Sequence, residues 1–205
     1  MVRRHRDEMK TPMTGPDPAD AGSAVKLRLA VTADRLACFF PLLQKGFAID
    51  VTLGRPIHAL LRDQLGVPES YIETKIQTVF LDGKPVDDID TALVRDGATL
   101  ALAPAMPGLM GAMLRRGGYY APMRSGITHR DDRTAQEIKE GRIVVKLFGA
   151  ALRDLGPTFL KRGVQVDSGD LAKVMRELPE GCGEGAGGEE ALANQGRVHL
   201  QVNAV

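Results

Sequence analysis

The chain has 205 residues, of which 43% are hydrophobic and 26% are charged. This composition predicts a globular protein with a buried core, and it excludes wholesale disorder, a collagen and a coiled coil. The net charge is +1 and only 4% of the residues are aromatic, so neither bulk charge nor exposed rings favour binding to nucleic acid.

The beginning of the chain mixes charges with prolines and glycines, and we predict a flexible leader over residues 1–24. The leader has no apolar stretch of the kind found in secretory signals, which predicts a cytoplasmic protein. Residues 97–114 are uncharged, but Pro104 and Pro107 interrupt them, so we expect no membrane span. Cys38 lies in the apolar run 36–40 and is predicted to be a core residue.

A first domain is predicted over residues 25–106. Pro56 begins an amphipathic helix whose leucines fall on one face, and Asp82-Gly83 is a strong hairpin signal. The strands predicted around them cover residues 26–31, 47–51, 76–81, 84–86 and 99–103. One helix that crosses a small mixed sheet is typical of the β-grasp (ubiquitin-like) architecture, so the expected fold class is α+β.

Residues 107–140 are predicted to be an apolar and basic connecting segment, and residues 141–205 a second, incomplete β-grasp-like half. Ser168 is a candidate N-cap of a helix that ends near residue 178, and residues 181–188 are predicted to be a glycine-rich loop. The strands predicted in this half cover residues 142–148, 164–167 and 197–202.

The two halves align at a constant offset of 117 residues. Residues 42–50 then match residues 159–167, with three identical pairs that include Gly46 and Gly163. The shared order of elements favours a duplicated β-grasp unit. Because the second copy ends at its third strand, we expect its sheet to expose an edge that recruits the first domain, another subunit or a partner.

Two segments resemble the small sulfur-carrier proteins of thiamine and molybdopterin synthesis. Residues 80–104 look like the closing half of these proteins, and residues 145–156 are similar to the opening of the molybdopterin type. The resemblance implies a carrier whose free C-terminal Gly-Gly holds sulfur. In this chain residues 104–111 stand where that tail would be, and the diglycine Gly117-Gly118 comes later. A carrier would therefore need cleavage after Gly118, whereas a chain-reversing turn needs no processing.

Residues 107–114 are apolar on every side and carry two methionines, so we expect another part of the chain or another molecule to cover them. The arginines that follow, beside open glycine backbone, form a possible anion or nucleotide site, or else a solvated or self-paired segment. The interaction and anion candidates are Met106, Gly108, Leu109, Met110, Met113, Arg115, Arg116, Gly117, Gly118 and Arg124.

These observations favour a non-catalytic β-grasp module that binds a protein partner, or forms a homo-oligomer, through residues 104–126 and the edge of the second-half sheet. The alternatives are a processed sulfur-carrier or ubiquitin-like protein ending at Gly118, and an anion-binding protein built on Arg115, Arg116 and Arg124. No catalytic, cofactor or metal residues are predicted, and no binding to nucleic acid or membranes. His58 is predicted to be a solvated surface histidine.

Overall fold

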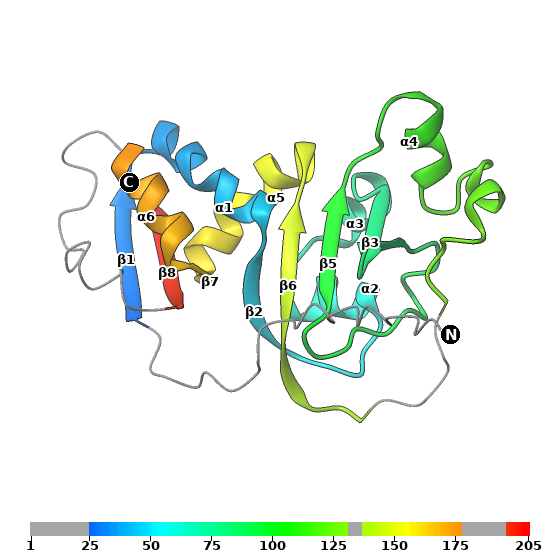
Figure 1. Cartoon of the computed structure of the whole chain (residues 1–205), viewed down its shortest axis with the longest axis horizontal. Coiled ribbons are helices and arrows are strands. Elements are labelled where there is room, and N and C mark those ends of the chain that lie inside the picture. Colours follow the sequence, from blue (N-terminus) through cyan, green and yellow to red (C-terminus); the bar gives the residue numbers. More distant parts are fainter. Residues whose placement is uncertain (1–24, 131–136, 178–195) are drawn as a thin grey trace, which may run out of the picture.

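The computed structural model describes residues 25–130, 137–177 and 196–205. The predicted leader and glycine-rich loop lie outside the described residues. Within them the chain forms an α+β structure with one eight-stranded mixed sheet and six α-helices (Figure 1). The strands are β1 (Val25–Val31), β2 (Phe47–Thr52), β3 (Thr78–Leu81), β4 (Lys84–Pro85), β5 (Thr99–Ala103), β6 (Glu140–Leu147), β7 (Val164–Asp167) and β8 (Arg197–Ala204).

The α-helices are α1 (Phe40–Lys45), α2 (Ile57–Ala59), α3 (Glu69–Thr74), α4 (Gly108–Leu114), α5 (Gly149–Arg162) and α6 (Ser168–Glu177). Two short 3-10 helices, η1 (Ala33–Phe39) and η3 (Ala121–Arg124), and one π-helical turn, η2 (Leu60–Gln64), complete the structure. The helix predicted after Pro56 is thus α2 followed by η2. The predicted strands and the helix at Ser168 are present with shifts of a few residues at their ends.

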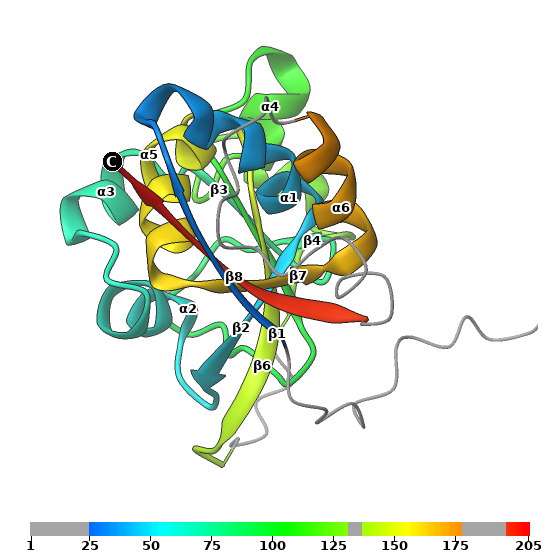
Figure 2. The ribbon, with the colours of Figure 1, turned by 90° about the vertical axis from the view of Figure 1, so that its left-hand side faces the viewer.

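The strand order is β1-β8-β7-β2-β6-β5-β3-β4. Strands from the two halves of the chain are interleaved in this order: β6 lies between β2 and β5, and the β8–β7 pair lies between β1 and β2. The β5–β6 and β1–β8 pairs are parallel, and the other strand pairs are antiparallel. Figure 2 shows β1 and β8 crossing the direction of β2 and β6, which is the twist expected of a large sheet.

The edge of the second-half sheet is occupied by the first half of the chain, so the prediction that a partner or a second copy binds at this edge is wrong. Strand β8 has a neighbour on each side, and the two edge strands are β1 and β4, both from the first half. The reason is that β1 pairs in parallel with β8 over seven residues, from Val25 opposite Val198 to Val31 opposite Ala204. Strand β1 thereby pairs with the edge of β8 that was expected to be exposed.

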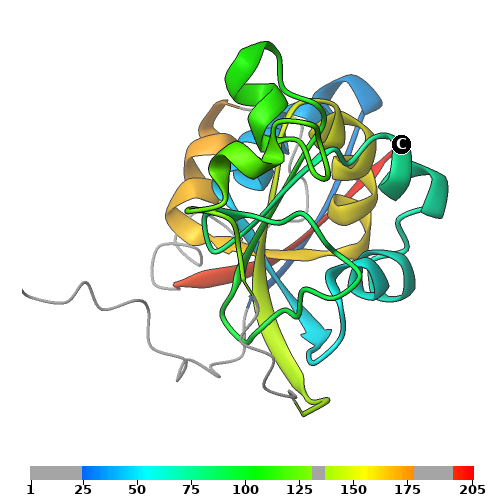
Figure 3. The ribbon, with the colours of Figure 1, turned by 90° about the vertical axis from the view of Figure 1, so that its right-hand side faces the viewer.

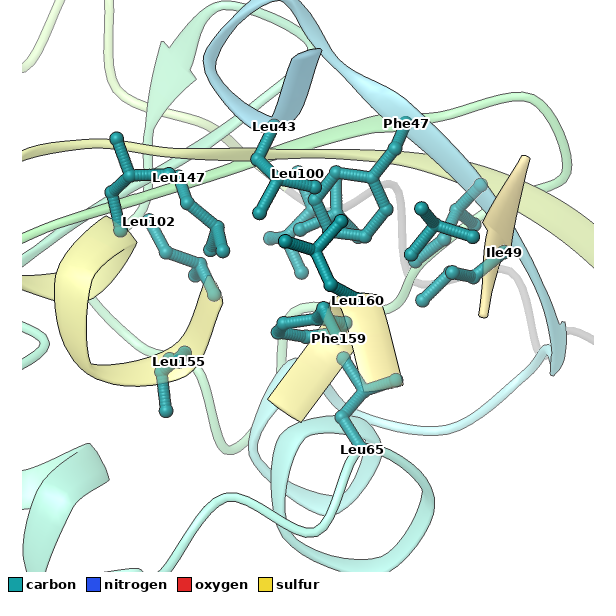
Figure 4. Packing of buried hydrophobic residues seen from close by; sticks show 14 of the residues in the cluster. Leu43, Phe47, Ile49, Leu65, Leu100, Leu102, Leu147, Leu155, Phe159 and Leu160 are labelled. Atoms are coloured by element: carbon teal, nitrogen blue, oxygen red, sulfur yellow. The ribbon is translucent and has the colours of Figure 1, made fainter. Parts of the chain in front are cut away.

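One hydrophobic core joins both halves. Figure 4 shows Phe47 of β2 and Leu43 of α1 packed with Phe159 and Leu160 of α5, and the rings of Phe47 and Phe159 are 5.1 Å apart between centroids. Helices α2, α3 and α5 lie on one side of the sheet, and α6 lies on the other (Figures 2 and 3). The core therefore rests on residues that are far apart in the sequence.

The alignment of the two halves corresponds to a real similarity in local structure. The aligned residues Gly46 and Gly163 each end a helix and begin a strand, with φ of 127° and 99° and ψ of 137° and 134°. Backbone with such positive φ favours glycine, which accounts for glycine at both positions. In both halves a strand, a helix, a strand and a further helix follow one another in that order.

Candidate functional site

Large apolar side chains are exposed on one segment of the structure, formed by α4, η3 and the turn between them. We call Leu109, Met110, Tyr119, Tyr120 and Met123 the apolar surface; their exposed fractions are 64, 66, 90, 40 and 67%. They are five of the nine large hydrophobic residues that are exposed in the described part of the chain. Of the apolar segment expected to be covered, Leu109 and Met110 are thus left exposed by the described part of the chain, whereas Gly111 is buried and Met113 and Leu114 are half-buried.

The segment lies at the end of the molecule opposite β1, beyond β3 and β5 (Figures 1 and 3). It is held there by Arg124, whose side chain is only 1% exposed. The Arg124 guanidinium makes two hydrogen bonds to the Asp87 carboxylate, at 2.6 and 3.1 Å, and one to Thr128 Oγ1 at 2.8 Å. It also donates to the backbone carbonyls of Met113 and Arg115, at 2.6 and 3.5 Å.

These contacts decide between two roles that were open for Arg124. A guanidinium has five N–H donors, and the five hydrogen bonds of Arg124 occupy all of them. Arg124 therefore has no donor left for an external anion. Its role is to tie α4 and η3 to Asp87, in the connection that follows the β3–β4 hairpin.

The diglycine forms part of the same anchor. Gly117 has a φ of 59°, and its N–H donates to Asp87 Oδ1 at 3.1 Å. The N–H of Gly118 donates to the carbonyl of Arg115 at 3.2 Å. The two glycines thus form a hydrogen-bonded turn. The chain beyond them supplies β6, a central strand of the sheet.

A pocket of about 560 Å³ opens beside this turn. Its lining brings together five of the predicted candidates, Met106 and the consecutive residues Arg115 to Gly118, and it also includes Gly111. The remaining lining residues are Glu73, Gln77, Ala105, Ala112, Tyr119 and Tyr120. Because Tyr119 and Tyr120 also belong to the apolar surface, the pocket and the apolar surface are continuous.

The other candidate residues lie outside the pocket lining. Leu109 and Met110 are on the exposed part of α4, and Met113 contributes its carbonyl to Arg124. Gly108 begins α4, with open space where a side chain would be. Gly111 differs, because a Cβ there would stand 2.0 Å from the Met106 carbonyl oxygen, so α4 packs directly on the backbone that precedes it.

The two arginines of the pocket differ in burial. Arg115 is exposed, whereas Arg116 is half-buried and donates from its side chain to the carbonyl of Ile72 at 3.2 Å. Its backbone N–H donates to the carbonyl of Gln77 at 2.8 Å. Burial lowers the pKa of Arg116, although the nearby carboxylates of Asp90 and Glu73 act in the opposite direction.

A second polar cluster surrounds His58, which sequence reasoning placed on the solvated surface. His58 is 24% exposed and lies between two carboxylates: its Nδ1 is 2.5 Å from Asp90 Oδ1 and its Nε2 is 2.6 Å from Glu69 Oε1. No group of three or more histidine, cysteine or carboxylate side chains in the described residues is placed to hold a metal ion. The two contacts link His58 of α2 to Glu69 of α3 and to Asp90 in the connection that follows β4.

Sequence reasoning missed Glu73 and Gln77 as members of the site, and it did not single out Tyr119 and Tyr120, although both lie in the predicted interaction segment 104–126. The two tyrosines were visible beside the diglycine, and exposed aromatic side chains next to arginines are a usable signal for an interface. The pairing of Asp87 with Arg124 gave no local signal, because 37 residues separate them in the sequence. Only the folded chain brings them together.

Comparisons with other proteins identify no relative from which a function could be inferred. No protein-family model, no curated protein and no solved structure matches the chain. In the part of the chain that the structure describes, no helix is both long enough and apolar enough to cross a membrane.

Proposed function

We propose that this chain is a non-catalytic protein-interaction module that binds another protein through the apolar surface. One observation carries the proposal: five exposed apolar side chains lie on a segment that a buried arginine holds in place. Contiguous exposed apolar side chains mark interaction sites in folded proteins, and tyrosine and methionine are enriched in such interfaces. A second copy of the chain is the alternative occupant.

Holding the segment in place contributes to binding. A surface that is ordered before it meets its partner loses less conformational entropy on binding than a disordered one. The hydrogen bonds of Arg124 and of Gly117 to Asp87 supply this order in the free protein. The apolar surface is thus exposed and preorganised at once, which is the combination that a docking site requires.

We further propose that strands β2-β6-β5-β3-β4 form a β-grasp unit whose opening strand comes from the second half of the chain. The segment that resembles the opening of a sulfur carrier includes the end of β6, and the segment that resembles the closing half ends in β5. These two strands lie side by side and parallel in the sheet. The resemblance concerns the fold, and the fold alone does not carry over the chemistry of the carriers.

The processed-carrier alternative is less well supported. Cleavage after Gly118 would separate β6 from the strands on either side of it, and its three core side chains Ile143, Val145 and Leu147 are fully buried. The product would be a two-chain complex rather than a small free carrier. Both backbone N–H groups of the diglycine are also already engaged in the folded chain.

The proposal is tested on the full chain in the cells that make it. A tagged chain is expressed at its natural level and its assembly is sized by gel filtration. We expect an assembly larger than the monomer, and we expect the double variant Leu109→Gln with Met110→Gln to elute as the monomer. Ile138→Gln is the matched control, because Ile138 is 68% exposed but lies outside the apolar surface.

Circular dichroism of the purified variants establishes that both are folded. Mass spectrometry of the assembly separates a partner protein from a second copy of the chain. If the double variant and the Ile138→Gln control elute alike, the apolar surface does not mediate the assembly and the proposal is wrong.

A further inference from the structure

The charge of the pocket beside the apolar surface indicates what kind of partner fits it. Its lining contains two guanidinium cations, Arg115 and Arg116, and one carboxylate, Glu73. The side chains that line the pocket therefore carry a formal charge of +1 next to five exposed apolar side chains, with the Asp90 carboxylate acting on Arg116 from outside the lining. This pattern is complementary to a single negative charge that is flanked by apolar groups.

Arg116 is the residue best placed to hold that charge. Its backbone N–H and its side chain are fixed by the carbonyls of Gln77 and Ile72. Only one of its five side-chain N–H donors is used by that contact. Within the described residues the Arg116 guanidinium makes no ion pair with a carboxylate. Partial burial makes such a pair favourable, because burial costs a charged group part of its hydration. Asp90 and Glu73 are the acidic groups that act on it from nearby.

The same lining argues for a carboxylate rather than a phosphate. Phosphate sites on glycine backbone need free N–H groups that point at the anion. Here the N–H of Gly117 donates to Asp87 and the N–H of Gly118 donates to the carbonyl of Arg115. Glu73 would also repel a dianion more strongly than a monoanion. Arg115 and Arg116 alone remain as donors. Their guanidinium groups fit a carboxylate and a phosphate alike, so the preference for a carboxylate rests on the engaged glycine N–H groups and on Glu73.

We infer that the pocket binds an aspartate or glutamate side chain of an acidic peptide segment of the partner, whose neighbouring apolar side chains pack on the apolar surface. The inference rests on the proposed function, because the peptide belongs to the protein that docks there. Tyr119 and Tyr120 join the two parts of the site, since they line the pocket and belong to the apolar surface. The charge gives specificity, and the apolar contacts exclude water around it.

A random peptide library displayed on phage, selected on the immobilised full chain, tests the inference. We expect the enriched peptides to share an aspartate or glutamate next to apolar residues. One enriched peptide is then synthesised together with its amide analogue, in which that residue is replaced by asparagine or glutamine. The analogue is expected to bind about 10- to 100-fold more weakly, since one charge-assisted hydrogen-bonded contact is lost.

Variants of the pocket give the reciprocal measurement. The double variant Arg115→Gln with Arg116→Gln is expected to weaken the acidic peptide by a similar factor and to bind the amide analogue as the unaltered chain does. Arg130→Gln is the matched control, because Arg130 is exposed and lies outside the lining. Circular dichroism confirms that each variant is folded.

The inference is overturned if no peptide is enriched over a surface without protein, if the enriched peptides lack an acidic residue, or if the double variant binds the peptide as tightly as Arg130→Gln does. None of these outcomes contradicts the proposed function if the gel-filtration experiment shows that the assembly depends on Leu109 and Met110. If the assembly does not depend on them, the proposed function fails by its own test, whatever the peptides show.

Discussion

Arg124 shows at the scale of one residue how the site is built. Its side chain is 1% exposed, and five hydrogen bonds surround it. Replacing it by alanine leaves the carbonyl of Met113 and the carboxylate of Asp87 without the hydrogen bonds that Arg124 donates to them. We therefore expect Arg124→Ala to lower the free energy of unfolding by about 3 kcal/mol, as measured by urea denaturation.

Arg130→Ala is the matched control for this measurement. Arg130 is exposed and makes one long hydrogen bond, of 3.4 Å, to the carbonyl of Ser125. Its replacement is expected to change the free energy of unfolding by less than about 0.5 kcal/mol. Equal effects of the two substitutions would show that Arg124 does not anchor α4 and η3.

His199 gives a prediction about pH. It lies on β8 opposite Lys26 of β1 and Gln165 of β7, and burial together with the charge of Lys26 lowers its pKa from 6.5. Asp50 acts in the opposite direction, and Arg28 adds to the lowering. The unfolded chain therefore takes up a proton near pH 6.5 that the folded chain takes up only at lower pH.

It follows that His199 makes the folded state lose stability as the pH falls below about 6.5. We expect the free energy of unfolding of the unaltered chain to decrease more between pH 7.5 and pH 5.5 than that of the variant His199→Gln. Urea denaturation of both proteins at several pH values measures the difference. If the two curves stay parallel over this range, the surroundings of His199 do not lower its pKa.

Single residues were the hardest to predict from the sequence. Cys38 was expected in the core because it lies in an apolar run, but it is exposed while Leu36 and Phe39 are buried. The run forms the 3-10 helix η1, whose period of three residues places Leu36 and Phe39 on one side and Cys38 on another. His58 was expected in solvent because no partner for it is visible nearby in the sequence. Its two carboxylate partners, Glu69 and Asp90, come from other parts of the structure.

At the scale of elements, local signals were sufficient for most of the structure. Short windows of sequence show three such signals: the alternation of apolar and polar residues in β1, the Asp82-Gly83 turn, and the leucines on one face of α2 and η2. The order of the strands was not visible. It depends on pairing between residues about a hundred positions apart, as between Phe47 and Val145, and the alternation of one strand does not specify its neighbour.

The central place of β6 leads to a prediction about the separated halves. Ile143, Val145 and Leu147 of β6 are fully buried, and burial of such side chains contributes about 1.5 to 3 kcal/mol each. A fragment without β6 lacks this stabilisation, which is comparable to the whole free energy of unfolding of a domain, roughly 5 to 15 kcal/mol. We therefore expect a fragment of residues 1–130 to be unfolded on its own.

The fragment of residues 137–205 is expected to be unfolded as well, because β1 no longer covers β8. Mixing the two fragments in equal amounts should restore the circular dichroism spectrum of the intact chain and a cooperative thermal transition. Cooperative unfolding of either fragment alone would mean that the two halves are independent units.

At the scale of the whole molecule, the two ends of the sheet differ. At one end β1 is an edge strand that carries Lys26 and Arg28 on its exposed face, and such charges discourage pairing with another strand. At the other end α4 and η3 expose the apolar surface and the pocket. Association of this chain is thus expected through side chains at the α4 end rather than through the sheet.

The most direct measurement of that expectation is site-specific photo-cross-linking in living cells. A photoreactive phenylalanine analogue is introduced into the full chain at Met123, or at Ile138 as the control; their exposed fractions are 67 and 68%. We expect a discrete cross-linked protein adduct from position 123 and none from position 138. Equal cross-linking from the two positions, or none from position 123, would contradict the assignment of the apolar surface as the docking site.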